Sequence, residues 1–287
     1  MRLKRIFTIT GSVVIILFVG LFLFLHFYKP PLSVNYGKVD AQLFIGDSED
    51  QPLIVAFGGS QGGNTWTEDY WAEMRTEFLR QGYAILSIGY FNTENTPETL
   101  DRISLNAIYN TIKRISDHPK ISKDKIALLG SSRGGELVLT LASIYKDFNA
   151  VVALVPPHVR FPSATLTANT SAWTFNGQEL SYLKIPYAAI GPALRGESLR
   201  LAEITLENEG DMPESIIPVE KINGPILLLS AKGDALWPSA YMSERIADRL
   251  RDNNFKYYFE HVSFEGGHHD TKKHFDKVFE FLNNHLK

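Results

Sequence analysis

The sequence predicts an α/β fold, in which a mostly parallel central sheet carries helices on both faces. Two features of the chain predict it. Short apolar runs alternate with stretches whose apolar residues recur at helical spacing, and this order is typical of parallel strands joined by crossover helices. One of the apolar runs also leads directly into a G-x-S-x-G turn and a helical segment. We therefore expect one large domain over residues 35–287.

The predicted strands are short runs rich in Val, Ile, Leu and aromatic residues. Continuous apolar runs of this kind indicate strands that are buried on both faces. They are Leu53–Phe57, Tyr83–Ile88, Ile126–Leu129, Ala150–Val155, Ile226–Ser230 and Tyr257–Val262.

Helical spacing of apolar residues predicts helices within Thr67–Gln81 and Glu98–Ser116. The second segment follows Thr96-Pro97, which is a typical helix start. Residues 156–224 break the alternation, because they hold many Pro, Gly, Ser and Thr and few periodic runs. We interpret this segment as a lid or cap insertion, since long excursions from a compact domain are often functional.

Composition excludes some classes of function. The 287 residues carry a net charge of −3, so the chain lacks the basic field that non-specific nucleic-acid binding requires. The sequence has no cysteine, which excludes disulfides, thiolate metal sites and a cysteine nucleophile. We expect no nucleic-acid partner.

Residues 6–28 form an apolar run in which only His26 can carry a charge. The run is long enough to cross a bilayer as a helix, and it is longer than the apolar part of a cleavable signal peptide. It predicts an uncleaved transmembrane anchor, followed by a Pro-rich linker at residues 29–34. Basic residues lie mainly before the run, within residues 1–5, so the positive-inside rule places the N-terminus in the cytoplasm and the domain on the extracytoplasmic side.

The G-x-S-x-G motif centres on Ser132. A strand-like run ends at Leu129, Gly130 and Gly134 flank the serine, and helical spacing follows from Glu136. This is the order of a nucleophile elbow, a strained turn in which Cβ atoms at the two glycines would collide with neighbouring backbone. The alternative is an ordinary strand-to-helix turn in which the serine caps the helix.

A glycine-rich loop, Gly58–Gly63, follows the first buried strand. An oxyanion loop occupies this place when a nucleophile elbow is present. We expect the backbone N–H groups of Gly59, Ser60 and Arg133 to bind a developing oxyanion. The loop lacks the Gly-Lys-Ser/Thr ending of a P-loop and the spacing of a dinucleotide fingerprint, whereas a plain flexible turn stays an alternative.

Asp234 and His268 each follow the end of a later predicted strand. Catalytic groups of open α/β sheets lie at those ends, and the chain order Ser, Asp, His is that of α/β-hydrolases. The predicted triad is Ser132, Asp234 and His268, with His268 as base and Asp234 fixing its tautomer. The neighbouring His269 is a less favoured base. A metal site among His268, His269, Asp270 and His274 is disfavoured, because residues so close in sequence rarely converge on one ion.

These residues resemble the C-terminal catalytic domain of the acyl-CoA thioesterase and bile-acid-CoA:amino acid N-acyltransferase family. The resemblance spans roughly residues 35–287 and implies the same triad, with His268 rather than His269. It rests on the oxyanion loop, the triad and several further stretches: Gly82–Phe91, Gly130–Leu137, Ser171–Trp173 with Gly177, Ile217–Glu220, Gly233-Asp234 with Trp237–Ser239, and Gly267-His268. Mammalian members carry an additional N-terminal β-sandwich domain, and here the predicted anchor stands in its place.

The expected activity is hydrolysis of an acyl thioester or carboxylic ester through an acyl-Ser132 intermediate, with the acyl chain held by the insertion. An outward-facing domain would seldom meet acyl-CoA, an intracellular metabolite, which favours another thioester or an ester. Acyl transfer to an amine and a serine peptidase or aminopeptidase activity stay open. The non-enzyme alternative is a membrane-tethered binding protein on an inactive scaffold. We expect an acyl substrate and a membrane as partners, and no cofactor or metal.

Overall fold

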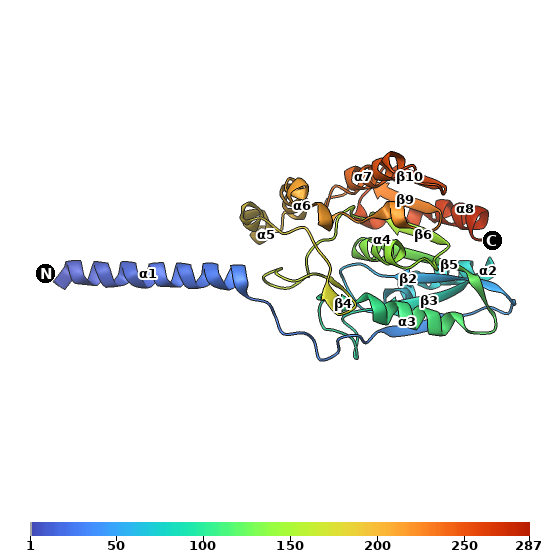
Figure 1. The fold of residues 1–287 in the computed structure, drawn as a ribbon, viewed down its shortest axis with the longest axis horizontal. Coiled ribbons are helices and arrows are strands. Elements are labelled where there is room, and N and C mark those ends of the chain that lie inside the picture. Colours follow the sequence, from blue (N-terminus) through green and yellow to red (C-terminus); the bar gives the residue numbers. More distant parts are fainter. Residues whose placement is uncertain (1) are drawn as a thin grey trace.

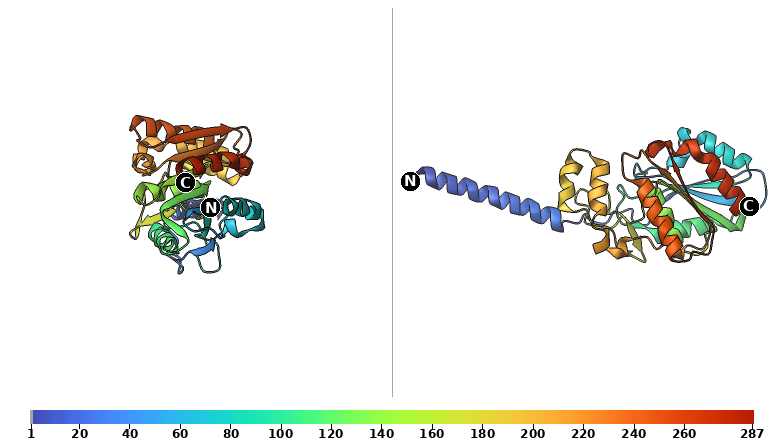
Figure 2. Two further views of the ribbon diagram at one scale, coloured as in Figure 1. Left: turned by 90° about the vertical axis from the view of Figure 1, so that its right-hand side faces the viewer. Right: turned by 90° about the horizontal axis from the view of Figure 1, so that it is seen from above.

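The computed structural model describes residues 2–287, and the side chains of residues 12–287. The chain begins with one long helix, α1 (Arg2–Phe27), which projects away from the rest of the molecule. Figures 1 and 2 show that the remaining residues form one body with a central sheet between layers of helices. The predicted α/β class is therefore confirmed.

The main sheet has seven strands in the order β1-β3-β2-β5-β6-β9-β10. All neighbours are parallel except β1, which is antiparallel to β3. All six predicted strands lie in this sheet, which consists of β1 (Asp40–Phe44), β2 (Gln51–Phe57), β3 (Ala84–Gly89), β5 (Ile121–Ser131), β6 (Ala150–Leu154), β9 (Ile226–Ala231) and β10 (Phe259–Phe264). The sequence did not predict β1, because this edge strand is half exposed and lacks a continuous apolar run.

Helices cover both faces of the sheet, as predicted. Alternate side chains of β2 enter the two cores, with Leu53 and Val55 on one side and Ile54 and Ala56 on the other. The first core is closed by α3 (Leu105–Ser116), α4 (Arg133–Ile144) and α7 (Ser239–Asp252). The second is closed by α2 (Ala72–Arg80) and α8 (Phe275–His285).

The start predicted for the second helix, after Thr96-Pro97, is wrong. Helix α3 begins at Leu105, because the Ser104 side chain accepts a hydrogen bond from the Ala107 amide at 3.2 Å and caps the helix. Just before it, β4 (Ile103–Ser104) pairs with a strand of the insertion. The spacing of apolar residues gives no information on this pairing, because the two strands are distant in the sequence.

The insertion (residues 156–224) leaves the sheet after β6 and returns at β9. It contains β7 (Trp173–Phe175), β8 (Gln178–Glu179), α5 (Ile190–Leu194) and α6 (Ser198–Leu206). Strands β4, β7 and β8 form a second sheet, and buried apolar residues of the insertion pack on Trp237 and Met242 in a small core of their own. The insertion is thus a structured part of the domain.

No helix among residues 12–287, whose side chains the structure describes, is long and apolar enough to cross a membrane. The transmembrane anchor predicted at residues 6–28 therefore lacks support from the structure. Its first positions, 6–11, lie outside the residues with described side chains.

Candidate active site

Ser132 occupies a strained turn between β5 and α4. Its φ of +58° is a region that non-glycine residues rarely adopt. The turn is held from both sides, because the Ser132 amide donates to the Leu154 carbonyl at 2.8 Å and its carbonyl accepts from the Glu136 amide at 3.1 Å. The serine side chain is partly exposed and lines a cavity.

The two glycines that flank Ser132 are required by backbone contacts. A Cβ atom on Gly130 would lie 2.1 Å from the Gly134 carbonyl oxygen. A Cβ atom on Gly134 would lie 2.4 Å from the carbonyl oxygen of Gly58, in the predicted oxyanion loop. The collisions predicted for a nucleophile elbow are therefore confirmed, and the second one places the loop directly against the elbow.

The glycine-rich loop reaches the serine at Gly59. A Cβ atom built on Gly59 would lie 3.2 Å from the Ser132 Cβ atom, so only a glycine brings the loop backbone this close without displacing it. Tyr90, which is buried, donates a hydrogen bond to the Gly58 carbonyl at 2.9 Å and holds the loop from behind. This role of Tyr90 was not predicted.

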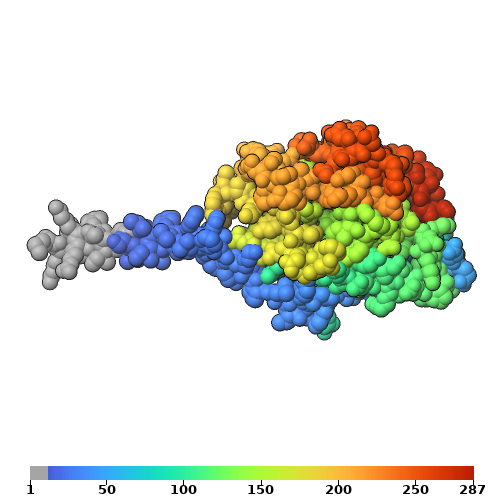
Figure 3. Space-filling view, viewed as in Figure 1, coloured from blue at the N-terminus to red at the C-terminus, as the bar shows by residue number. Residues whose placement is uncertain are grey.

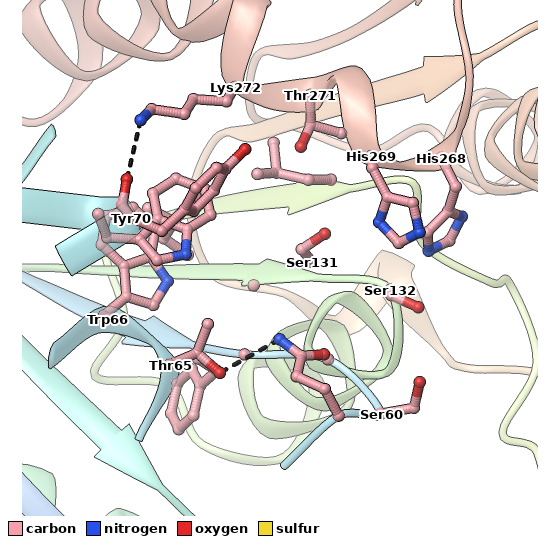
Figure 4. Close-up of a pocket in the computed structure, with 18 of the residues that line it drawn as sticks. Ser60, Thr65, Trp66, Tyr70, Ser131, Ser132, His268, His269, Thr271 and Lys272 are labelled. Carbon is pink, nitrogen blue, oxygen red and sulfur yellow. Dashed lines mark hydrogen bonds between the residues drawn. The ribbon is translucent and has the colours of Figure 1, made fainter. Parts of the chain in front are cut away.

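The other two predicted oxyanion donors also lie at the elbow or the loop. Arg133 is the first residue of α4, so its amide has no partner within the helix. Ser60 is exposed at the edge of the cavity, and Figure 4 shows it on the same side as Ser132 and His268. The assignment of Gly59, Ser60 and Arg133 as oxyanion donors stays a prediction.

Asp234 and His268 are brought together by the loops that follow β9 and β10. His268 Nδ1 donates to Asp234 Oδ2 at 2.8 Å, and both side chains are buried. The second carboxylate oxygen, Oδ1, accepts from the amides of Leu236 and Trp237 at 2.9 and 3.3 Å. The alternative base, His269, is exposed. The geometry therefore joins His268, and not His269, to the carboxylate.

Opposing effects act on the Asp234 carboxyl group. Burial raises its pKa, whereas the hydrogen bond from His268 and the charge of that ring lower it, and the balance leaves the pKa below its usual value. Asp234 is thus held ionised, as a residue that orients an imidazole must be. On its other side, the His268 ring meets the edge of the Trp237 ring, with centroids 5.6 Å apart.

A cavity of about 340 Å³ opens beside Ser132 and His268. Its far wall is aromatic, as Figure 4 shows for Trp66 and Tyr70, and Trp71 completes it. Lys272 donates to the Tyr70 carbonyl at 2.8 Å, and its ammonium lies 4.5 Å from the centre of the Tyr70 ring. The aromatic wall was missed, although the signal was present as a cluster of Trp and Tyr directly after the glycine-rich loop.

The described lining of this cavity includes no residue of the insertion. The expectation that the insertion holds the acyl chain stays a prediction. The insertion lies close to the site, because its Phe161 ring stacks on Trp237, whose ring lies edge-on to His268.

A family model described as "BAAT / Acyl-CoA thioester hydrolase C terminal" matches residues 104–272, which is more than half of the chain. The chain belongs to this family. The matched stretch contains Ser132, Asp234 and His268 but not the glycine-rich loop, which lies before it. The resemblance noted in the sequence is confirmed.

Two human relatives are named acyl-coenzyme A thioesterases 1 and 6. They are 27% identical over 238 residues and 29% identical over 221 residues. The alignments cover 79% and 76% of this chain but only 52% and 49% of the relatives, so the chain spans about half the length of these proteins.

Solved structures show the fold. A puromycin-hydrolyzing peptidase of Mycobacterium tuberculosis superposes with a TM-score of 0.61 at 16% identity, over 86% of this chain and 37% of that one. An alpha/beta hydrolase from Penicillium sp. sh18 superposes with a TM-score of 0.53 at 14% identity, over 87% and 99% of the two chains. This member of the thioester hydrolase family therefore has an α/β-hydrolase fold.

The Arg133 side chain is part of a buried network rather than an open anion site. Its guanidinium lies 3.3 Å from Glu136 and donates to the Pro162 carbonyl at 3.0 Å, at the start of the insertion. Glu136 is completely buried and accepts a hydrogen bond from the Trp173 indole, also in the insertion, at 2.5 Å. Burial raises the pKa of Glu136, while the Arg133 charge opposes that rise. The network ties the insertion to the elbow.

The residues considered as a metal site have other partners. Besides His268 on Asp234, the Asp270 carboxylate accepts from the Gly267 amide at 2.7 Å, and the His274 ring stacks on Phe264. The contacts of Asp270 and His274 are structural.

Proposed function

We propose that this chain hydrolyses an acyl thioester, or a carboxylic ester, through an acyl-Ser132 intermediate. The observation that carries the proposal is the Asp234–His268 hydrogen bond at the cavity that Ser132 lines. Membership of a family described by acyl-CoA thioester hydrolysis supports the same chemistry. The strained elbow supports it too, because a structure keeps such a turn where function requires it.

In the proposed reaction, His268 removes the proton from Ser132 as the serine oxygen attacks the substrate carbonyl. The amides of Gly59, Ser60 and Arg133 bind the oxyanion that forms, and such a donor is worth roughly 3 kcal/mol. When the intermediate collapses, the carbon–sulfur or carbon–oxygen bond breaks and His268 returns the proton to the leaving group. Water, activated by His268, then cleaves the acyl-Ser132 ester, and the free acid leaves.

The cavity supports an apolar acyl group as substrate. Trp66, Tyr70 and Trp71 offer flat apolar surfaces, and Leu236 adds an aliphatic one. The names of the human relatives favour a thioester of coenzyme A over a simple ester if the domain is cytoplasmic, whereas an extracytoplasmic domain would seldom meet acyl-CoA. Because the chain spans half of those proteins, its own substrate is part of the proposal.

A substrate panel tests this proposal. Release of free thiol from acyl-CoA thioesters is compared with cleavage of p-nitrophenyl esters and of peptide amides, in the wild-type chain, in Ser132→Ala and in Ser131→Ala. Ser131 lines the same cavity one residue earlier and provides the matched control. We expect thioester turnover that is lost in Ser132→Ala and kept in Ser131→Ala. Equal turnover in the two variants would show that Ser132 is not the nucleophile, and amide cleavage above thioester cleavage would assign a peptidase.

The location of the domain is a separate proposal, which rests on the sequence alone. The basic residues before the apolar run favour a cytoplasmic N-terminus and an extracytoplasmic domain. Protease treatment of intact cells that express the chain tests it. Digestion of the domain supports the outward orientation, and full protection contradicts it and favours intracellular acyl-CoA as substrate.

A further inference from the structure

The C-terminal end of α1 is fixed against the insertion by side-chain contacts. His26 Nδ1 lies 2.5 Å from the Tyr187 hydroxyl. Asn169 donates to the Leu25 carbonyl at 2.8 Å, and Thr167 donates to the Tyr28 carbonyl at 2.9 Å. In Figure 1 and in the right-hand view of Figure 2, α5 and α6 lie beside this end of the helix. The direction of α1 is thus tied to one face of the domain.

Four residues of the insertion near this helix end are apolar and exposed, and two of them, Ile190 and Leu194, belong to α5, which lies beside it in Figure 1. Leu166 and Leu194 are 85% and 84% exposed, and Tyr187 and Ile190 complete what we call the insertion patch. Leu166 precedes Thr167, which binds the chain after α1, while Tyr187 contacts the helix itself. Figure 3 shows the end of α1 meeting this part of the surface. Apolar exposure concentrated at one place marks an interaction surface.

The described part of α1 identifies what covers this surface. Apolar side chains are exposed at every position from Val13 to Val19 and again from Leu21 to Phe24. Successive positions of an α-helix point in all directions, so residues 13–24 of α1 expose apolar side chains on every face. A partner protein or a second copy would cover one face, whereas lipid covers all of them. Lipid is therefore the occupant that fits α1.

We propose that the insertion patch lies on a lipid bilayer, in the boundary between headgroups and acyl chains. An apolar surface of this kind enters that boundary by roughly 5–10 Å. Tyr28 and Tyr187 stand at the junction of α1 with the patch, and amphipathic aromatic residues prefer this depth. The contact follows from the side chains of residues 12–28 and of the insertion, whether or not the helix crosses the bilayer.

This placement has a consequence for the supply of substrate. The insertion leaves the carboxyl end of β6, and Ser132 follows the carboxyl end of the neighbouring strand β5. The lipid-facing patch therefore belongs to the same edge of the sheet as the candidate site. An acyl substrate dissolved in the membrane would approach the protein from the side that carries the catalytic residues.

Site-specific fluorescence tests the proposal directly, because the chain has no cysteine of its own. Leu166→Cys and Leu194→Cys are labelled with an environment-sensitive nitrobenzoxadiazole dye in the full chain, reconstituted in phosphatidylcholine vesicles. Tyr258→Cys is the control, because Tyr258 is also exposed but directly precedes β10, at the amino ends of the strands and away from the insertion. A second set of vesicles contains phosphatidylcholine that carries a doxyl spin label near the headgroup.

We expect blue-shifted emission at positions 166 and 194, lost when the spin-labelled lipid is present, and water-like, unquenched emission at 258. Water-like emission at all three positions would overturn the proposal. Blue-shifted emission that the spin-labelled lipid does not quench would also overturn it and would assign the patch to a protein partner. The readout needs no turnover, so its failure is distinguishable from failure of the proposed hydrolase activity.

Discussion

The elbow (residues 130–135) and the insertion are in contact through Arg133, yet different kinds of contact hold their conformations. The elbow is fixed by contacts within a few residues and with one loop, since added Cβ atoms on Gly130 and Gly134 would meet backbone at 2.1 and 2.4 Å. The insertion is held by contacts between distant segments, such as Thr170 with Asp101 at 2.6 Å. A short motif can therefore encode the first region, whereas only the folded chain defines the second.

The largest expected effect comes from Asp234, which orients the base His268 in the reaction proposed at the elbow. Asp234→Asn keeps the size of the side chain but stabilises the wrong tautomer of His268, and in a triad this lowers kcat by about 10⁴-fold. Steady-state kinetics on the best substrate of the panel measures it, with circular dichroism to show that the fold is kept. A variant with near wild-type kcat would remove Asp234 from the proposed mechanism.

The second largest effect is expected from the buried network of Arg133, Glu136 and Trp173, which links the two regions. Glu136→Ala leaves the Arg133 guanidinium buried without its carboxylate and the Trp173 indole without its acceptor. Removing one partner of a buried pair costs about 3–5 kcal/mol of unfolding free energy. Urea unfolding measures the loss, and Glu136→Gln, which keeps an acceptor for Trp173, should lose less. Equal stability of Glu136→Ala and the wild type would mean that the network does not join the regions.

A pair of glycine variants separates the two regions most cleanly. Gly134→Ala must displace the Gly58 carbonyl, and strain of this kind lowers the unfolding free energy by roughly 1–3 kcal/mol. Gly210→Ala, in the insertion, places its Cβ atom in open space and should leave stability and activity nearly unchanged. Thermal unfolding and thioester turnover check both variants. Similar losses in the two would contradict the contrast between the regions.

The smallest effect is a dependence of stability on pH. Because the pKa of Asp234 is lower in the folded state than its ordinary value of 3.8, ionised Asp234 stabilises the fold above that value. The contribution is lost as the pH falls through the folded-state pKa. The unfolding free energy of the wild type should therefore approach that of Asp234→Asn in acid. A difference between the two proteins that stays constant from neutral pH into acid would contradict the ionised assignment.

The sequence predicted the buried strands and the elbow because their signals are local. Continuous apolar runs identified six strands, and the two glycines around Ser132 identified a turn that only glycine permits. It also placed His268 correctly beside Asp234, since both follow strands that end at one edge of the sheet.

Features that depend on distant partners were not predictable in the same way. The start of α3 was misplaced because Ile103 pairs with a strand of the insertion. The support of the glycine-rich loop by Tyr90 depends on the pairing of β3 with β2, which brings the chain after both strands together. Helical or strand periodicity carries no information on which distant segments meet.

The most direct test of the account is the position of the covalent adduct. The wild-type chain, Ser131→Ala and Ser132→Ala are treated with a fluorophosphonate, digested, and sequenced by tandem mass spectrometry. We expect phosphonylation of Ser132 in the wild type and in Ser131→Ala, and none in Ser132→Ala. An adduct on Ser131, or labelling that persists in Ser132→Ala, would contradict the assignment of Ser132 as the nucleophile.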